Sequence, residues 1–240
     1  MRSPMCSFFA GRINARQVEE SIQPDDVHRA HTRLVSLENT SNRGGGSCYD
    51  FAEILAVREV CNRHGLGFHL DGARLWNAIV ARKEDPLAYG KTFDSISVCL
   101  SKSLGCPVGS LLVGSAAFIK KAKRYRKVFG GGMRQAGIIA AAGIYALENN
   151  IKRLEEDHRH AAAIAAAIAK RAFVKMVLPV ETNIIIFELN DSITAPQLVS
   201  RLKEQDILGY AISPNRVRLV THLDITAAMT EKTIQVFNQL

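Results

Sequence analysis

The sequence indicates a buried strand most clearly at residues 66–71, which read LGFHLD. Successive side chains of a strand point to opposite sides, so Phe68 and Leu70 face one side while His69 and Asp71 face the other. Such a strand has one apolar face for a core and one polar face. Asp71 stands at its carboxyl end, where open parallel sheets bind their ligands.

Helices and strands alternate on both sides of this strand. Residues 49–64 repeat apolar side chains at helical spacing, with Asp50 as a candidate N-cap and Gly65 as a candidate C-cap. Strands are also predicted at residues 32–39 (TRLVSLEN) and 95–100 (SISVCL). This alternation predicts parallel pairing through helical crossovers. The sequence therefore predicts an α/β fold, with a mainly parallel sheet flanked by helices.

The chain divides into three predicted parts. Residues 1–26 form an irregular N-terminal segment, and residues 27–155 form the larger domain with the parallel sheet. Residues 156–240 form a small C-terminal α+β domain, because strand patterns return there at residues 174–189 and 216–223.

The composition excludes several classes of protein. The 240 residues are 47% hydrophobic and 22% charged, which supports a buried core and excludes a disordered or collagen-like chain. No apolar run is long enough to span a membrane. The five cysteines are an odd number and form no C-x-x-C pair, which predicts reduced thiols in a cytoplasmic protein rather than a disulfide framework.

The net charge of +8 comes from one segment. Residues 120–134 (KKAKRYRKVFGGGMR) hold seven basic residues and no acidic one, so the rest of the chain stands at +1. Such a segment can bind nucleic acid, bind a small anion or form a solvated helix face. Only Tyr125 and Phe129 offer stacking and no nucleic-acid fold motif is present, so a nucleic-acid-binding module is the weakest of these hypotheses.

Two side chains at strand ends could carry chemistry. Lys102 follows the strand at residues 95–100, and Asp71 ends the strand before it. A desolvated lysine at the end of a sheet has a depressed pKa and can attack a carbonyl as a neutral amine. The simpler alternatives remain open at this point: Lys102 as an ordinary turn lysine, and Asp71 as a helix cap paired with Arg74.

Together, these two residues favour a pyridoxal phosphate site. A lysine can bind the aldehyde of this cofactor, and a carboxylate can keep its ring nitrogen protonated, so that the ring accepts electrons. The phosphate needs backbone N–H groups or cations, and the Gly-rich bend at residues 130–132 lies between Lys127 and Arg134.

Four motifs resemble the low-specificity L-threonine aldolase family, whose members are fold-type I pyridoxal phosphate enzymes related to the aromatic amino acid β-eliminating lyases. They are HLDGARLWNA at residues 69–78, SVCLSKSLGCPVGSLLVG at 97–114, YRKVFGGGMRQAGIIAAAGIYALE at 125–148 and VRLVTHLD at 217–224. The similarity runs from about Asp25 to the C-terminus. It implies cleavage of L-threonine or L-allo-threonine to glycine and an aldehyde.

The resemblance also implies roles for individual residues. Lys102 matches the cofactor-binding lysine, and Asp71 matches the carboxylate that faces the pyridine nitrogen. Arg74 matches an arginine that contacts the cofactor and the substrate carboxylate, and Arg218 matches a second arginine that binds this carboxylate. His28 resembles a histidine near the substrate side chain and is a candidate base.

Further residues are implied to act between subunits. Lys127 and Arg134 match a loop that, in the family, reaches an active site across the dimer interface, so a homodimer or homotetramer is expected. The resemblance implies no metal, nucleic-acid or membrane partner. A metal site could use His64, His69 and Asp71. Of these, His69 and Asp71 share a face of the strand, but a third ligand at suitable spacing is missing.

The sequence departs from the family pattern in its N-terminal part. The family usually has a substantial N-terminal portion, with a phosphate cradle and a histidine that stacks on the ring, and residues 1–24 resemble neither. Ser41 stands where the family favours a histidine. We therefore expect weak cofactor retention and an exposed apolar surface. A catalytically impaired truncated homologue and a β-eliminating lyase of the same fold remain the alternatives.

Overall fold

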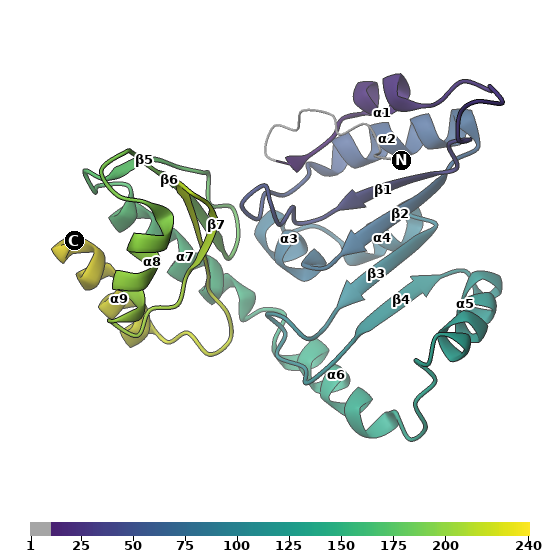
Figure 1. Cartoon of the computed structure of the whole chain (residues 1–240). Coiled ribbons are helices and arrows are strands. Elements are labelled where there is room, and N and C mark those ends of the chain that lie inside the picture. Colours follow the sequence, from purple (N-terminus) through teal and green to yellow (C-terminus); the bar gives the residue numbers. More distant parts are fainter. Residues whose placement is uncertain (1–10) are drawn as a thin grey trace.

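The computed structural model describes residues 11–240 and contains two separate sheets (Figure 1). The first has the strand order β1-β2-β3-β4 and the second has the order β5-β6-β8-β7. Long helices connect and flank them. The fold therefore contains a larger α/β unit followed by a smaller α+β unit, as the sequence predicted.

The first sheet is mainly parallel. Its strands are β1 (Leu34–Glu38), β2 (Gly67–Gly72), β3 (Ser95–Cys99) and β4 (Ser110–Gly114). β2 pairs in parallel with both β1 and β3, whereas β4 runs antiparallel to β3. The carboxyl ends of β1, β2 and β3 consequently meet at one edge of the sheet, on the side of the smaller unit (Figure 1).

Helix α2 (Phe51–His64) has both of the expected ends. Asp50 accepts from the backbone of the first turn and Glu53 closes a capping box, which satisfies N–H groups that would otherwise lack partners. Gly65 ends the helix in the left-handed conformation, which a residue without Cβ adopts easily. The local sequence alone therefore fixes the bounds of this crossover helix.

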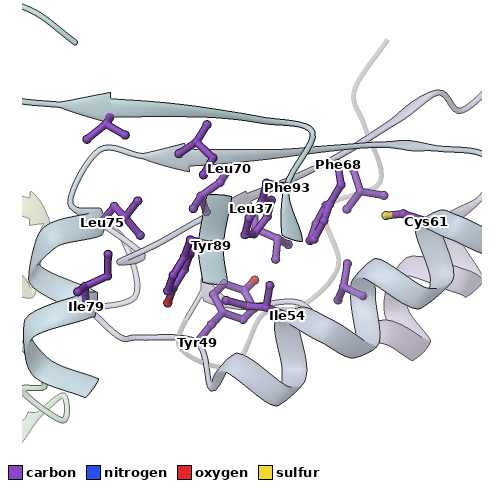
Figure 2. Close-up of a cluster of buried hydrophobic side chains, with 14 of the residues drawn as sticks. Leu37, Tyr49, Ile54, Cys61, Phe68, Leu70, Leu75, Ile79, Tyr89 and Phe93 are labelled. Atoms are coloured by element: carbon purple, nitrogen blue, oxygen red, sulfur yellow. The ribbon is translucent and has the colours of Figure 1, made fainter. Parts of the chain in front are cut away.

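Helices cover one face of the first sheet. Phe68 and Leu70 are fully buried, while His69 is half-buried and Asp71 is exposed, which confirms the alternation expected along β2. The buried face packs against α2, α3 (Leu75–Arg82) and α4 (Pro86–Thr92). In Figure 2 the rings of Tyr49, Tyr89 and Phe93 lie among the aliphatic side chains of this core.

Burial decreases sharply after β3. Every residue of β4 is exposed, and α5 (Ala116–Val128) buries no side chain at all. Helix α6 (Gly137–Asn149) buries only Gly143 and Ala146. The apolar side chains Leu112, Phe118 and Ile144 are among those left exposed, so the expected apolar surface is present on these three elements.

The smaller unit packs its own core between helices and an antiparallel sheet. Its strands are β5 (Val174–Val177), β6 (Ile184–Leu189), β7 (Tyr210–Ser213) and β8 (Arg216–Val220), and every strand pair in it is antiparallel. Helices α7 (Leu154–Ile168), α8 (Ala195–Lys203) and α9 (Ala227–Gln239) complete it. All six residues of β6 are buried, so this strand forms the centre of the unit.

The two cores divide within α7. Leu154 belongs to the core of the first unit, whereas Ala161, Ile164 and Ile168 belong to the core of the second. Before this point, α1 (Ala15–Ser21) packs Val18 into the first core. Part of the predicted segment 1–26 therefore contributes to the larger unit; residues 1–10 lie outside the described residues.

Candidate active site

The edge formed by the carboxyl ends of β1, β2 and β3 collects most of the predicted site residues. Glu38 of β1 lies opposite Asp71 of β2, which in turn lies opposite Ser97 of β3. Lys102 follows in the turn after β3. Asp71 and Lys102 thus lie at the carboxyl ends of adjacent parallel strands, where the sequence predicted the pyridoxal phosphate site.

Asp71 is not the cap of α3. Its Oδ1 accepts from the backbone N–H of Ala73 at 3.0 Å, a turn that keeps the carboxylate at the end of β2. Helix α3 begins after Arg74 without any side-chain cap. The simpler alternative for Asp71, a helix cap with Arg74 as its ion-pair partner, is therefore wrong.

Lys102 is exposed, and the expectation that it lies in a desolvated pocket is wrong for the described residues. Its backbone carbonyl accepts from Gly105 at 2.9 Å, which closes the turn that carries it. The next residue, Ser103, is buried and anchors this turn against the smaller unit. Lys102 is consequently an exposed residue on a turn that hydrogen bonds hold in place.

Two arginines converge on one amide at this edge. Arg74 Nη1 donates to Oδ1 of Asn42 at 3.4 Å, and Arg218 Nη1 donates to the same atom at 2.9 Å. Burial, together with the neighbouring Arg218 guanidinium, lowers the pKa of Arg74 from its ordinary value. Nε of Arg218 is buried and has no hydrogen-bond partner among the described residues. The two guanidinium groups share one neutral partner, and guanidinium groups form charge-assisted hydrogen bonds with carboxylates.

Asn42 is a site residue that the sequence reasoning missed. It lies in the Gly-rich loop after β1, and its backbone N–H donates to Oε2 of Glu38 at 3.1 Å. That bond holds the loop against the end of the strand, so the Asn42 amide faces both arginines. The sequence did contain a signal for Asn42. It follows β1, and the ends of the two neighbouring strands bear charged residues.

Cys99 links the lysine and arginine parts of the site. It ends β3 on the same face as Asp71, and its Sγ lies 3.6 Å from Oγ of Ser101. Although burial opposes the change, hydrogen bonds with Ser101 and the nearby Lys102 ammonium lower the pKa of the Cys99 thiol. The same thiol acts electrostatically on Arg74. Lys102, Cys99 and Arg74 therefore share one electrostatic environment.

Three predicted residues lie elsewhere. His28 is exposed in the segment before β1, at the amino end of the sheet, where its backbone N–H donates to Asp26 at 2.8 Å. Lys127 lies in the last turn of α5, and Arg134 follows that helix; both are exposed. In Figure 1 this helix stands beyond β4, away from the carboxyl edge. The structure thus brings Asp71, Lys102 and the two arginines together but not these residues.

A metal site receives no support. Within residues 11–240, no group of three or more His, Cys, Asp or Glu side chains could hold a metal ion. None of the helices in that range is both long enough and apolar enough to cross a membrane.

Comparison with known proteins agrees with this fold and site. A family model described as beta-eliminating lyase matches residues 3–192. The chain therefore belongs to the beta-eliminating lyase family. It combines the parallel sheet, the antiparallel unit and the strand-end lysine and carboxylate on one chain.

Its similar relatives carry a more particular name. The low specificity L-threonine aldolase of Escherichia coli (strain K12) is 44% identical over 223 residues, which are 93% of this chain and 65% of that protein. Low-specificity L-threonine aldolase 1 of Arabidopsis thaliana is 42% identical over 211 residues, 87% of this chain and 59% of the relative. The chain thus spans less than two thirds of these relatives.

Solved structures show the same fold. A threonine aldolase of Leishmania major aligns with a TM-score of 0.82 at 19% identity, covering 98% of this chain and 69% of that one. A PLP-dependent aminotransferase from Streptococcus suis aligns with a TM-score of 0.70 at 14% identity, covering 96% and 61%. Both confirm the expected fold-type I architecture.

Proposed function

We propose that the protein cleaves L-threonine and L-allo-threonine to glycine and an aldehyde in a reaction that depends on pyridoxal phosphate. The observation that carries this proposal is the convergence of Arg74 and Arg218 on Asn42, next to the strand ends that bear Asp71 and Lys102. The names of the relatives support the same substrate class.

The residues at this edge fit the cofactor. Lys102 offers an exposed amine for its aldehyde, and the exposed carboxylate of Asp71 can face its ring nitrogen from the neighbouring strand. When bound, pyridoxal phosphate supplies an electron sink for the charge that remains on the substrate Cα. Asp71 favours this by holding a proton on the ring nitrogen.

Arg74 and Arg218 orient the substrate. Their guanidinium groups bind its carboxylate through charge-assisted hydrogen bonds and take up the anion in place of the Asn42 amide. Holding the carboxylate would orient the bonds of the substrate Cα, so that the Cα–Cβ bond is the one that breaks. Cleavage then breaks the Cα–Cβ bond, the β-hydroxyl oxygen becomes the aldehyde oxygen, and Cα takes up a proton to give glycine.

The β-hydroxyl proton needs an acceptor. His28 was predicted for this role, but within one chain it lies at the opposite end of the sheet from Asp71. We propose that Lys127 and Arg134 act in a site of a second subunit, in a homodimer or homotetramer. The exposed apolar side chains of β4, α5 and α6 support such an assembly. In this assembly, His28 of one subunit would act in the site of another subunit.

We also propose a cytoplasmic location. The described cysteines Cys48, Cys61, Cys99 and Cys106 are all free, as expected for a protein that works in a reducing compartment.

Product analysis tests the proposed reaction. The protein is loaded with pyridoxal phosphate and given L-threonine or L-allo-threonine, and glycine and acetaldehyde are measured. Equal release of both products supports retro-aldol cleavage. Release of a 2-oxo acid and ammonia indicates β-elimination instead. A protein that binds the cofactor and yields neither pair of products contradicts the proposal.

A further inference from the structure

A three-residue loop of the smaller unit contacts the larger unit at three separate places. Oε2 of Glu181 accepts from Arg82 at 2.9 Å and from the backbone N–H of Cys48 at 3.3 Å. Thr182 Oγ1 donates to the carbonyl of Gly46 at 2.8 Å. Asn183 Nδ2 donates to Ser103 Oγ at 3.2 Å. The first two contacts reach α3 and the Gly-rich loop after β1, whereas the third reaches the turn that carries Lys102.

Asn183 is fully buried, as is Thr182. Nδ2 of Asn183 donates a second hydrogen bond to the carbonyl of Thr221 at 2.8 Å. The backbone N–H of Thr221 returns a bond to the carbonyl of Asn183 at 3.0 Å. Thr221 directly follows β8, the strand of Arg218. One buried amide thus ties the Lys102 turn to the end of the Arg218 strand.

The orientation of this amide follows from its partners. The carbonyl of Thr221 can only accept, so the group that faces it must be the NH₂ of Asn183. Oδ1 is left buried and without a partner among the described residues. The two hydrogen bonds that Nδ2 donates hold the side chain in this orientation, even though an unpaired buried acceptor is costly. An aspartate at position 183 would have the same shape, but it would lack the two N–H donors and would bury a negative charge.

We propose that Asn183 is a positioning residue that sets the spacing between Lys102, which holds the cofactor, and Arg218, which holds the substrate carboxylate. This assignment rests on the proposed function. Lys102 and Arg218 belong to different units, and Asn183 bonds to Ser103, the residue after Lys102, and to Thr221, three residues after Arg218. Loss of its two donors lets the Lys102 turn and the Arg218 strand shift apart, and the substrate is then held by its carboxylate at the wrong distance from the cofactor.

Kinetics of three variants test this role against a merely structural one. Asn183→Ala and Ser103→Ala remove the same bond from its two sides. Thr92→Val is the matched control, because it deletes one buried hydrogen bond, to the carbonyl of Ala88 within α4, that reaches neither Lys102, Arg218 nor Asn42. We expect KM for L-threonine to rise about tenfold or more in Asn183→Ala and less in Ser103→Ala. Thr92→Val should stay within about twofold of the wild type.

Two further results separate this inference from the proposed function. In hydrogen exchange of the same proteins, the peptide around residues 100–106 should lose protection in Asn183→Ala and Ser103→Ala but keep it in Thr92→Val. If the wild type does not cleave threonine but exchange changes in this way, the proposed function fails and the positioning of the Lys102 turn stands. If Asn183→Ala keeps both KM and exchange near the wild type, the inference is overturned. Equal changes in Thr92→Val overturn it as well.

Should Asn183→Ala fail to fold, Ser103→Ala carries the test alone, since it alters one small side chain and leaves the Asn183–Thr221 bond intact. A wild-type KM and wild-type exchange in a folded Ser103→Ala protein then contradict the inference.

Discussion

Arg74 of the larger unit and Arg218 of the smaller unit donate to the same atom, Oδ1 of Asn42, at 3.4 and 2.9 Å. This relationship defines the candidate site more sharply than any single residue. It places two cations from two units around one neutral amide. A substrate carboxylate is the natural ligand for such a pair, because each guanidinium can form charge-assisted hydrogen bonds with it.

Loss of the lysine amine should abolish cofactor attachment. In Lys102→Ala, the visible absorbance that pyridoxal phosphate gains on binding should disappear, because the amine that binds the cofactor aldehyde in the proposed site is gone. Borohydride should attach the cofactor permanently to the wild-type peptide that contains Lys102. The control is Lys91→Ala, an exposed lysine in the last turn of α4. An unchanged spectrum in Lys102→Ala would refute the assignment.

Neutralising the carboxylate should affect turnover more than binding. Asp71→Asn keeps the shape of the side chain but no longer favours a proton on the ring nitrogen. We expect kcat to fall about 10²- to 10³-fold while cofactor binding, followed by absorbance, is partly retained. The control is Asp191→Asn, an exposed aspartate in the smaller unit. A variant with wild-type kcat would show that Asp71 does not face the ring.

The arginine pair should govern substrate affinity. Arg218→Ala removes one of the two guanidiniums, and we expect KM for L-threonine to rise about 10- to 100-fold, as for a lost hydrogen bond to a charged group. Arg216→Ala provides the control, since Arg216 lies two residues earlier on β8 and pairs with Glu188 instead. If KM stays at the wild-type value in Arg218→Ala, Arg218 does not bind the carboxylate.

Stability should fall in mild acid through His158. Burial lowers the pKa of this histidine from 6.5 to about 4, and its Nε2 lies 3.0 Å from Oδ1 of Asn77 in the other unit. The unfolded chain binds this proton more readily than the folded one, so the stability contribution is present above pH 6.5 and is lost as the pH falls towards 4. The loss is at most about 3 kcal/mol.

Urea unfolding at neutral pH and near pH 4 measures this effect. His158→Gln should lose less stability than the wild type across that range, because it has no proton to gain. His31→Gln is the control, since His31 is exposed in the described structure. A wild-type pH dependence in His158→Gln would show that another group is responsible.

Local sequence was sufficient for strands β1, β2 and β3 and for the crossover helix α2. The capping residues of α2 and the alternation of Phe68 and Leu70 act over a few residues, so they can be recognised along the chain. Helix α4 and strand β7 were missed. For α4 the signals were present, because Asp85 caps the helix and Pro86 occupies its first turn, but a seven-residue helix shows little periodicity.

The strand pattern identified Asp71 and Lys102 as candidates, because each follows an apolar strand, and the family resemblance added Arg74 and Arg218. The sequence could not show that Lys102 is exposed, since burial depends on which elements cover the turn. Nor did it indicate that His28 would lie at the amino end of the sheet, away from the other candidates.

By itself, then, the sequence determined most of the strand and helix order, the family and the candidates for binding a cofactor, since these follow from local periodicity, capping and motifs. Only the tertiary structure decided which of those residues meet. Asn42 and Arg218 are 176 residues apart, and Asn183 and Ser103 are 80 apart. Contacts over such separations depend on how two independently packed cores dock, and no local pattern encodes that docking.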